Sequence, residues 1–248
     1  MLTRAGFING CSCRLHGESD VAPGTLNLAL HVGDDAAKVI RNRQRFAAAL
    51  NVDAAKFTTC QQVHSSRVAV VTEALIGKGA LDVADTIADT DALVTNLENV
   101  PLLLFYADCV PVLLADTRRR VIGLAHAGRR GTAAQIAAKT VQVMSKRFGS
   151  EPSDILAAIG PSIGACCYEV DDYVRDQFGG YEEFFAAQEK GKYQLDLQGV
   201  NKRQLMECGV AAGNIAVAGV CTACNSELFC SYRAEQGKTG RMGVCLSL

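Results

Sequence analysis

The chain has 248 residues, with 25 lysines and arginines against 26 aspartates and glutamates, so its formal net charge is −1. This near balance argues against a broadly basic nucleic-acid binder and against a polybasic membrane-surface protein. Hydrophobic residues make up 49% and charged residues 21% of the chain, a composition that is typical of globular proteins and excludes a disordered one.

Short apolar runs, most of them bounded by Asp, Asn, Gly or Pro, predict strands along the chain. Several of them follow one another between Ala92 and Ala125 without a helix between them, which disfavours a regular alternation of strand and helix. The predicted strands are Val68–Val71, Ala92–Thr95, Val100–Phe105, Val112–Ala115, Val121–Ala125, Ile155–Ile159, Tyr193–Leu197 and Ile215–Val220.

Three segments have the pattern of helices. Asp34–Leu50 opens with two aspartates, which suit the positive end of a helix. Thr132–Phe148 carries one apolar face and has the spacing of a capping box at Thr132 and Gln135. Gly199–Cys208 is the third segment. Together with the strands, these helices predict an α+β fold of mixed sheets with helices on the outside.

The remaining features predict the organisation and location of the protein. Linkers rich in Pro, Gly or Ser and fixed-period repeats are absent from the sequence, so we expect a single domain over residues 1–248. The longest apolar run, Val100–Tyr106, is far short of the ~20 residues that a membrane span needs, and the first residues lack a signal-peptide pattern. We therefore expect a soluble cytoplasmic protein, in which most of the 11 cysteines are free thiols.

Two of the four histidines and one cysteine lie at the ends of predicted core strands. His64 precedes one strand, whereas Cys109 and His126 each follow one. Strand ends are where a rigid scaffold presents reactive side chains to the loops. The separations between the three residues match no local metal-binding motif, so the case for a shared site depends on the topology of the sheet.

These three residues have two interpretations. Two histidines and a cysteine would leave zinc one open position for water or substrate, as catalytic zinc sites require, and zinc lowers the pKa of bound water to about 7. Asp108, beside Cys109, would orient a ligand or simply form a turn. Alternatively, the histidines are ordinary packed residues and Cys109 is a buried thiol. The residues alone leave both interpretations open.

Two basic segments also allow a functional and a structural interpretation. Arg129 and Arg130 follow His126 and precede a predicted helix, so they would form either an anion pocket or a solvated turn. Residues 231–243 are rich in glycine and cations, which suits either a phosphate-binding loop or a flexible basic loop. This segment lacks the Walker spacing of a nucleotide-binding loop.

The other cysteine and histidine motifs are interpreted structurally. The pair Cys221-Thr-Ala-Cys224 has no second pair or histidine nearby in the sequence to complete four ligands, and the same holds for Cys166-Cys167. We therefore interpret both pairs as free thiols. His31 precedes a helix and is expected to cap it or pack, and His16 is expected to be a loop residue.

At these residues the chain resembles the YfiH family, whose members have been described as laccase-domain or multicopper polyphenol oxidases, peptidoglycan editing factors and purine nucleoside phosphorylases. The resemblance covers nearly the whole length, and its strength lies in the order and number of the matching segments. These are Leu26-Asn-Leu-Ala-Leu-His-Val-Gly-Asp-Asp35, Gln62-Val-His64, Thr90-Asp-Ala-Leu-Val-Thr95, Ala107-Asp-Cys-Val-Pro-Val112, His126-Ala-Gly128, Ile159-Gly-Pro-Ser-Ile-Gly164, Cys167-Tyr-Glu-Val170, Cys221-Thr222 and Thr239-Gly-Arg-Met-Gly243.

The resemblance implies a metal site and a fold. His64, Cys109 and His126 match the three zinc ligands of the family, so they are expected to be both the metal ligands and the catalytic residues. Copper is the alternative metal. The implied fold is α+β, with packed mixed β-sheets and outer helices, and is YfiH-like (cysteine hydrolase-like).

The resemblance also implies an activity. The expected reactions are phosphorolysis of purine nucleosides (adenosine, inosine, guanosine and methylthioadenosine) and hydrolytic deamination of adenosine. A purine nucleoside and phosphate are therefore the expected partners. Phosphorolysis needs a bound anion, for which Arg233 and Arg241 are the candidate contacts, with Asn27 a weaker candidate for substrate binding.

Three residues depart from the family pattern around an intact ligand set. Arg129 stands where a Trp usually follows His-Ala-Gly, Ser65 replaces the common Gly after Gln-Val-His, and Cys230 stands where an aromatic residue is usual. These departures bear on the shape of the pocket and on substrate preference.

Other functions remain alternatives at this point. In a cysteine hydrolase or amidase, His126 or His64 would activate Cys109 as the nucleophile, with peptidoglycan precursors as a candidate substrate. Copper-dependent phenol oxidation is weaker, because four histidines are too few for the several His-x-His pairs of a multicopper site. A non-catalytic factor that recognises a cell-wall precursor or a partner protein is the third class.

Overall fold

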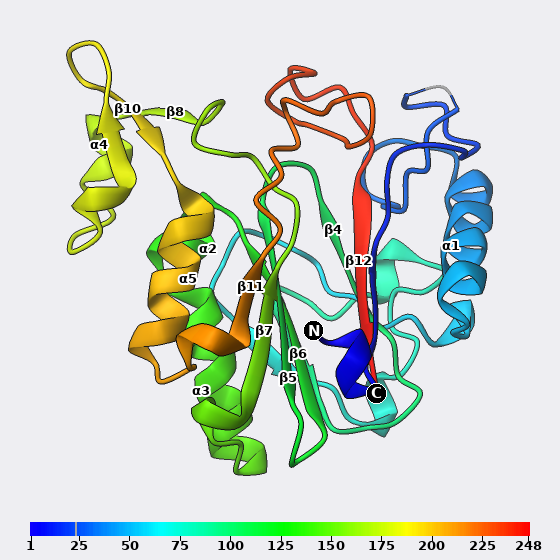
Figure 1. The fold of residues 1–248 in the computed structure, drawn as a ribbon. Coiled ribbons are helices and arrows are strands. Elements are labelled where there is room, and N and C mark those ends of the chain that lie inside the picture. The colour runs from blue at the N-terminus through cyan, green and yellow to red at the C-terminus, as the bar shows by residue number, and fades with distance from the viewer. Residues whose placement is uncertain (23) are drawn as a thin grey trace.

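The computed structural model describes residues 1–22 and 24–248 (Figure 1). Within them, a six-stranded mixed sheet has the strand order β11-β7-β5-β6-β3-β2. The inner neighbours β7·β5, β5·β6 and β6·β3 are antiparallel, and the outer pairs β11·β7 and β3·β2 are parallel. Its strands are β2 (Val68–Val70), β3 (Ala92–Thr95), β5 (Val110–Asp116), β6 (Val121–Ala127), β7 (Ile155–Ile159) and β11 (Ile215–Val217).

A smaller antiparallel sheet packs on one face of the first. It consists of β1 (Ile8–Cys11), β12 (Met242–Ser247) and β4 (Leu102–Tyr106), with β12 in the middle. Both faces of β4 are buried, which explains its uninterrupted apolar sequence. Leu102, Leu104 and Tyr106 pack toward the six-stranded sheet, and Leu103 and Phe105 pack on the opposite side.

Helices cover the outer faces of both sheets, so the molecule has four layers (Figure 1). α1 (Ala36–Leu50) lies on the three-stranded sheet, where Phe46 joins the cluster around Leu103 and Phe105. α3 (Ile136–Phe148) and α5 (Leu197–Glu207) lie on the six-stranded sheet. The predicted α+β architecture of packed sheets with outer helices is confirmed. The six-stranded sheet is mixed as expected, whereas the three-stranded sheet is antiparallel.

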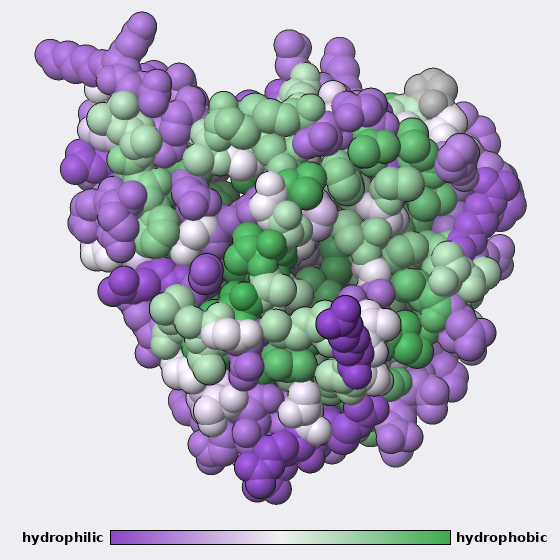
Figure 2. All heavy atoms as spheres, viewed as in Figure 1, coloured by the Kyte–Doolittle hydropathy of each residue, from purple (hydrophilic) through white to green (hydrophobic). Residues whose placement is uncertain are grey.

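A third, small antiparallel sheet extends from one corner, at the upper left of Figure 1. Its order is β8-β10-β9, with β8 (Glu169–Asp171), β9 (Phe185–Ala187) and β10 (Lys192–Leu195), and α4 (Asp172–Arg175) follows β8 directly. On the face drawn in Figure 2, apolar residues gather over the middle of the molecule and hydrophilic ones along its rim.

The helix predicted over Thr132–Phe148 is divided in two, which corrects the expected capping box. α2 (Arg129–Ala133) ends, and Gln135 then adopts a left-handed conformation with φ of 59° before α3 begins. The Thr132 hydroxyl donates back to the carbonyl of Ala127 at 3.2 Å instead of capping α3. The aspartate cap of α1 is confirmed, because Asp35 accepts the backbone N–H of Lys38 at 3.1 Å.

The other differences concern short elements. The strands β1, β8, β9 and β12 and the helix α4 were not predicted, and the predicted strand at 193–197 ends at Leu195, since α5 begins at Leu197. Among the residues described, no helix has the length and apolar character to cross a bilayer. Single 3₁₀ turns lie at Thr3–Ala5, Ala54–Lys56, Glu73–Leu75, Val83–Asp85, Pro152–Asp154, Glu182–Phe184 and Ala212–Asn214.

Candidate metal centre and active site

A buried aspartate organises the site. Asp91, which directly precedes β3, is fully buried. Its carboxylate accepts the backbone N–H groups of Val63, His64 and Ser65 at 3.2, 3.0 and 2.7 Å, and the Ser65 hydroxyl at 2.8 Å. These contacts hold the loop before β2 in place, including His64 with its positive φ of 59°.

The same carboxylate orients a second histidine. Asp91 Oδ1 lies 2.9 Å from Nδ1 of His126, which is the penultimate residue of β6. Because Nδ1 faces Asp91, the other ring nitrogen, Nε2, is left to face the site. One aspartate therefore positions both histidines, one through backbone amides and the other through its ring.

The three side chains that the sequence singled out converge. Cys109, in the turn between β4 and β5, has its Sγ 3.8 Å from His64 Nε2, and the rings of His64 and His126 lie 4.9 Å apart. One donor atom from each of the three residues lies within 4.8 Å of the others. Two imidazole nitrogens and one thiolate are ligands that suit zinc or copper. The donor set therefore fits a metal ion with a further position open.

Gly128 gives these side chains the space to meet. A Cβ atom at this position would lie 2.8 Å from Cys109 Sγ and 3.0 Å from His64 Cδ2. Its backbone, with φ of −70° and ψ of 178°, is one that any residue adopts. The absence of a side chain, and not an unusual conformation, is what this position requires.

The electrostatics of the site favour a thiolate. Burial by itself would raise the pKa of the Cys109 thiol, but the charges and hydrogen bonds of His126 and His64 outweigh it and lower the pKa to about 6. Burial would likewise lower the pKa of His126, but Cys109 and Asp91 together raise it to about 9. The site thus stabilises a thiolate at Cys109 next to a protonated imidazole at His126.

The donor cluster opens into a cavity of about 580 Å³. This volume is in the range of small-molecule sites. Besides the three donor residues, the cavity is lined by aromatic, polar and basic side chains, including His31, Gln62, Phe105, Tyr168, Tyr232, Arg233 and Arg241.

Both predicted arginine contacts border the cavity, and both lie against tyrosines. The guanidinium of Arg233 is 5.2 Å from the centre of the Tyr168 ring, and that of Arg241 is 5.7 Å from the Tyr232 ring. Arg241 also donates to the carbonyls of Thr239 and Gly240 at 2.7 and 2.9 Å. The basic segment at 231–243 therefore contributes Arg233 and Arg241 to the pocket.

Asn27 has a different place from the one expected. It is fully buried, its amide donates to Ala29 O and to Asp34 Oδ2 at 3.1 and 2.8 Å, and its Oδ1 accepts the backbone N–H of Arg241 at 2.9 Å. Among the described residues that line the cavity, Asn27 is absent. Its side chain fixes the backbone of Arg241, so a direct substrate contact is not supported.

Arg129 and Arg130, which the sequence left as either an anion pocket or a solvated turn, do not form part of the cavity lining either. Both residues lie on α2, which has only five residues. Arg129 is half-buried and Arg130 is exposed. The departure from the family pattern at Arg129 therefore lies next to the site and not inside it.

Asp108 ties together three segments around the cavity. Its Oδ1 accepts the Thr222 hydroxyl at 2.7 Å, its Oδ2 accepts the backbone N–H of Arg233 at 2.7 Å, and its carbonyl accepts the N–H of Ile163 at 2.9 Å. Its own φ is 83°. Asp108 is therefore a turn residue that also fixes the wall of the pocket.

Several residues of the site escaped the sequence reasoning, among them Asp91, two tyrosines and His31. Asp91 lies inside one of the matching segments, but a single acidic residue before a strand has no distinctive pattern. Tyr168 and Tyr232 border the cavity from loops. His31 also lines it, with its ring 6.0 Å from that of Phe105.

The chain is similar to several known proteins. The family model described as "Multi-copper polyphenol oxidoreductase laccase" matches residues 8–248. A Bacillus subtilis protein named purine nucleoside phosphorylase YlmD is 41% identical over 239 residues, which cover 95% of this chain and 86% of that protein. A protein from an unknown prokaryotic organism, named adenosine deaminase RL5, is 35% identical over 224 residues, 87% of this chain and 84% of that one.

Solved structures show the same fold. The crystal structure of YlmD from Geobacillus stearothermophilus superimposes with a TM-score of 0.95 at 40% identity, covering 98% of this chain and 92% of the other. The Bacillus licheniformis protein YfiH gives a TM-score of 0.95 at 39% identity with the same coverage. The relatives are named as enzymes, and the chain is an enzyme as well. The family model and the His/Cys donor groups both indicate a metal site. The chain belongs to the multi-copper polyphenol oxidoreductase laccase family, the laccase-like YfiH family that its sequence resembles.

Proposed function

We propose that the chain is a zinc-dependent purine nucleoside phosphorylase that also deaminates adenosine. Its proposed nucleoside substrates are adenosine, inosine, guanosine and methylthioadenosine. The observation that carries the proposal is the convergence of His64, Cys109 and His126 at a cavity that Arg233 and Arg241 also border. Relatives named as purine nucleoside phosphorylase and adenosine deaminase support it.

The cavity offers distinct surfaces for the base and the anion. Phe105, Tyr168 and Tyr232 provide aromatic faces on which a purine can stack. Arg233 and Arg241 provide guanidinium groups, which bind phosphate with paired hydrogen bonds. With both groups at one cavity, bound phosphate can be held against the sugar carbon that it attacks.

His64, Cys109 and His126 would hold the zinc ion. A zinc ion with three protein ligands supplies Lewis acidity and activates water at neutral pH, which deamination at the purine ring requires. The chain's own contribution is to hold the donors in place. Asp91 fixes the tautomer of His126 and the backbone of His64, and Gly128 keeps the space between the donors free.

The test is to incubate the purified, zinc-loaded protein with adenosine, with and without phosphate. We expect adenine and ribose 1-phosphate only when phosphate is present, and inosine in both cases. Cys109→Ala should lose both activities together with the zinc ion at this cavity. Cys208→Ala removes a half-buried thiol outside the cavity and should keep both. A protein that holds zinc and yields neither set of products contradicts the proposal.

A cysteine hydrolase is the second candidate, favoured by one observation. Cys109 Sγ lies 3.8 Å from His64 Nε2, and its pKa is lowered to about 6, so a nucleophilic thiolate is available. This reading predicts hydrolysis of an amide, such as one in a peptidoglycan precursor, by the metal-free protein. Activity that survives a chelator but not thiol alkylation would favour it over the zinc enzyme.

Copper-dependent phenol oxidation is tested in the same series. The description of the family model supports it, and the His64, Cys109 and His126 donors also suit copper. The copper-loaded protein would be assayed with a simple phenol under air. Phenol oxidation that exceeds nucleoside turnover by the zinc form would replace the proposal.

A further inference from the structure

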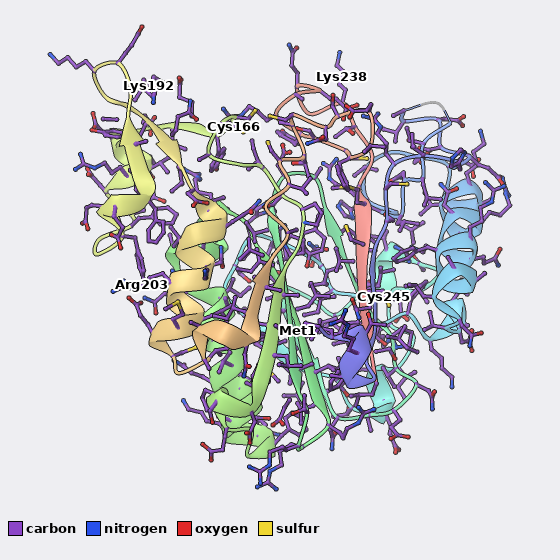
Figure 3. The ribbon with its side chains drawn as sticks, in the orientation of Figure 1. Met1, Cys166, Lys192, Arg203, Lys238 and Cys245 are labelled. Carbon is purple, nitrogen blue, oxygen red and sulfur yellow. The ribbon has the colours of Figure 1, made fainter. Side chains whose placement is uncertain are left out.

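Four other cysteines form a cluster outside the donor set of His64, Cys109 and His126. Cys166 and Cys167 lie on the loop that connects β7 to β8, and Cys221 and Cys224 lie in the turn after β11. Figure 3 marks Cys166 at the end of the molecule that also carries Lys238 of the loop before β12. In the sequence each pair lacks the partners of a metal site, but the fold brings the two pairs together.

Backbone hydrogen bonds hold the two loops that carry the cysteine pairs next to each other. Ser162 and Cys221 form a parallel bridge, with the N–H of Ser162 donating to Val220 O at 3.2 Å and the N–H of Thr222 donating to Ser162 O at 3.0 Å. β7 and β11 are themselves paired in parallel, so both loops begin at the same end of the sheet, where the two strands have their carboxyl ends. The two pairs are thus placed side by side by the ends of adjacent strands.

The sulfur atoms have the spacing of ligands around one ion. Cys224 Sγ lies 3.5 Å from Cys166 Sγ and 3.4 Å from Cys167 Sγ, and all four sulfurs lie within 4.8 Å of one another. A tetrahedral zinc ion with Zn–S bonds of about 2.3 Å separates its sulfurs by about 3.8 Å. A disulfide would require about 2.05 Å. The cluster therefore matches a tetrathiolate more closely than a cystine.

The surroundings of the cluster also suit thiolate ligands. The backbone N–H of Gly164 donates to Cys221 Sγ at 3.2 Å, the type of contact that orients and supports a metal-bound sulfur. A Cβ at Gly164 would lie 3.3 Å from Cys166 Sγ and 3.1 Å from Cys221 Cβ. Glycine at this position leaves room for the two sulfurs to approach each other.

We propose that Cys166, Cys167, Cys221 and Cys224 bind one zinc ion in a structural site. Four protein ligands fill the tetrahedron and leave no position for a substrate, unlike the three-donor set at the cavity. The ion would join two loops that border the cavity. Ile163 and Tyr168 flank the first pair and line the cavity, and Thr222 lies within the second motif and donates to Asp108. The inference stands apart from the proposed catalytic function, since it involves none of the same ligands.

Elemental analysis tests the proposal. The protein is purified under reducing conditions without added metal, and zinc is measured per chain. We expect two equivalents in the unmodified chain, one in Cys109→Ala, one in the double variant C221S/C224S, and two in the control Cys208→Ser. The proposal would be overturned if the unmodified chain held one equivalent of zinc and C221S/C224S held the same amount. Iron in place of zinc at the cluster would overturn it as well.

A second measurement covers the case in which C221S/C224S fails to fold. Cys109→Ala keeps all four cluster thiols, so its remaining ion can be replaced by cobalt. We expect the intense sulfur-to-cobalt charge-transfer absorption of a tetrathiolate, with the four thiols slow to react with a thiol reagent until a chelator is added. Four thiols that react at once, or a disulfide found by mass spectrometry after alkylation, would refute the site. Loss of nucleoside activity in Cys109→Ala with this spectrum intact separates the two proposals.

Discussion

Asp91 Oδ1 lies 2.9 Å from His126 Nδ1, while the same carboxylate receives the backbone N–H of His64 at 3.0 Å. The carboxylate is completely removed from solvent, so its charge depends on these donors for stabilisation. Burial would raise the pKa of Asp91, but the contacts with His126 and Ser65 outweigh it and lower the pKa. A single buried charge thus sets the geometry of both histidines.

Replacing this carboxylate should therefore weaken metal binding. Asp91→Asn keeps the shape of the side chain but removes the charge and offers an N–H group where acceptors are needed. Loss of a carboxylate that orients a metal-binding histidine typically costs 10- to 100-fold in metal affinity or activity, and we expect about that loss of zinc affinity. Competition with a chromophoric chelator measures it.

Asp89→Asn is the matched control for this variant. Its carboxylate is two residues away, is 61% exposed, and pairs with Arg67 at 3.6 Å. Exposed ion pairs contribute little, so we expect unchanged zinc affinity. Equal zinc affinities in the Asp91 and Asp89 variants would show that the buried carboxylate does not orient the donors.

Gly128→Ala should disturb the donor geometry without straining the backbone. The added methyl would lie 2.8 Å from Cys109 Sγ, so the thiol has to move. Small displacements of reacting groups cost up to 10²-fold in rate, and we expect at least a tenfold loss of nucleoside phosphorolysis. Gly213→Ala should keep full activity, because the new Cβ would meet no other part of the described chain within 4 Å beyond its own sequence neighbours. Full activity in both variants would mean that the close approach at Gly128 is unimportant.

Arg233→Met should act mainly on phosphate. The substitution removes a guanidinium that borders the cavity and lies over Tyr168, and charge-assisted contacts to phosphate are the strong ones. We expect KM for phosphate to rise at least tenfold and KM for the nucleoside to change much less. Arg175→Met is the control, because Arg175 also lies over a tyrosine, Tyr193, at 4.9 Å, but not at the cavity. If KM for phosphate and KM for the nucleoside rose equally, Arg233 would support the shape of the pocket and not bind phosphate.

Metal binding should depend on pH in two steps. With the pKa of Cys109 at about 6 and that of His126 at about 9, the metal-free site carries a thiolate and an imidazolium between these values. Binding then has to displace the proton of His126, because ligands bind in deprotonated form. Zinc affinity should therefore rise about tenfold per pH unit from pH 6 to 9 and more steeply below pH 6, where Cys109 also binds a proton.

Calorimetry in buffers of different ionisation enthalpy checks this directly. We expect about one proton released per zinc at pH 7.5 for the wild-type cavity site, measured in a C221S/C224S background so that only one site is filled. His126→Asn should abolish this release. A zinc affinity that stays constant from pH 6 to 9 would contradict the ion pair between Cys109 and His126.

Much of the fold could be predicted because its inner strands have a plain physical signature. β3, β4, β5, β6 and β7 are short apolar runs ended by turn residues. Burial on both faces of β3, β4, β5 and β6 requires that composition. Three of the strands that were not predicted, β1, β8 and β9, are three or four residues long and partly exposed. β8 contains two exposed acidic residues. β12 contains Gly243, whose missing side chain lets Leu28 and Leu103 pack against the strand, so it resembles the glycine-rich loop before it.

The site was predictable only in part for a related reason. His64, Cys109 and His126 are rare residue types at strand ends, so they attract notice, whereas Asp91 is one of many acidic residues. The break between α2 and α3 depends on the backbone of Gln135 and has no compositional signal. The cysteine cluster joins residues more than 50 positions apart, and only the parallel pairing of β7 with β11 brings them together.

The position of β12 has a consequence for how the protein matures. This strand joins residues 8–11 to residues 242–247 and continues the loop that carries Arg241. A ribosome therefore has to deliver nearly all of the chain before the pocket can acquire its last cation, and contacts this distant along the chain form late and slowly. His64, Cys109 and His126 are all synthesised more than 100 residues before Arg241, so the donor residues are made well before the last part of the cavity wall.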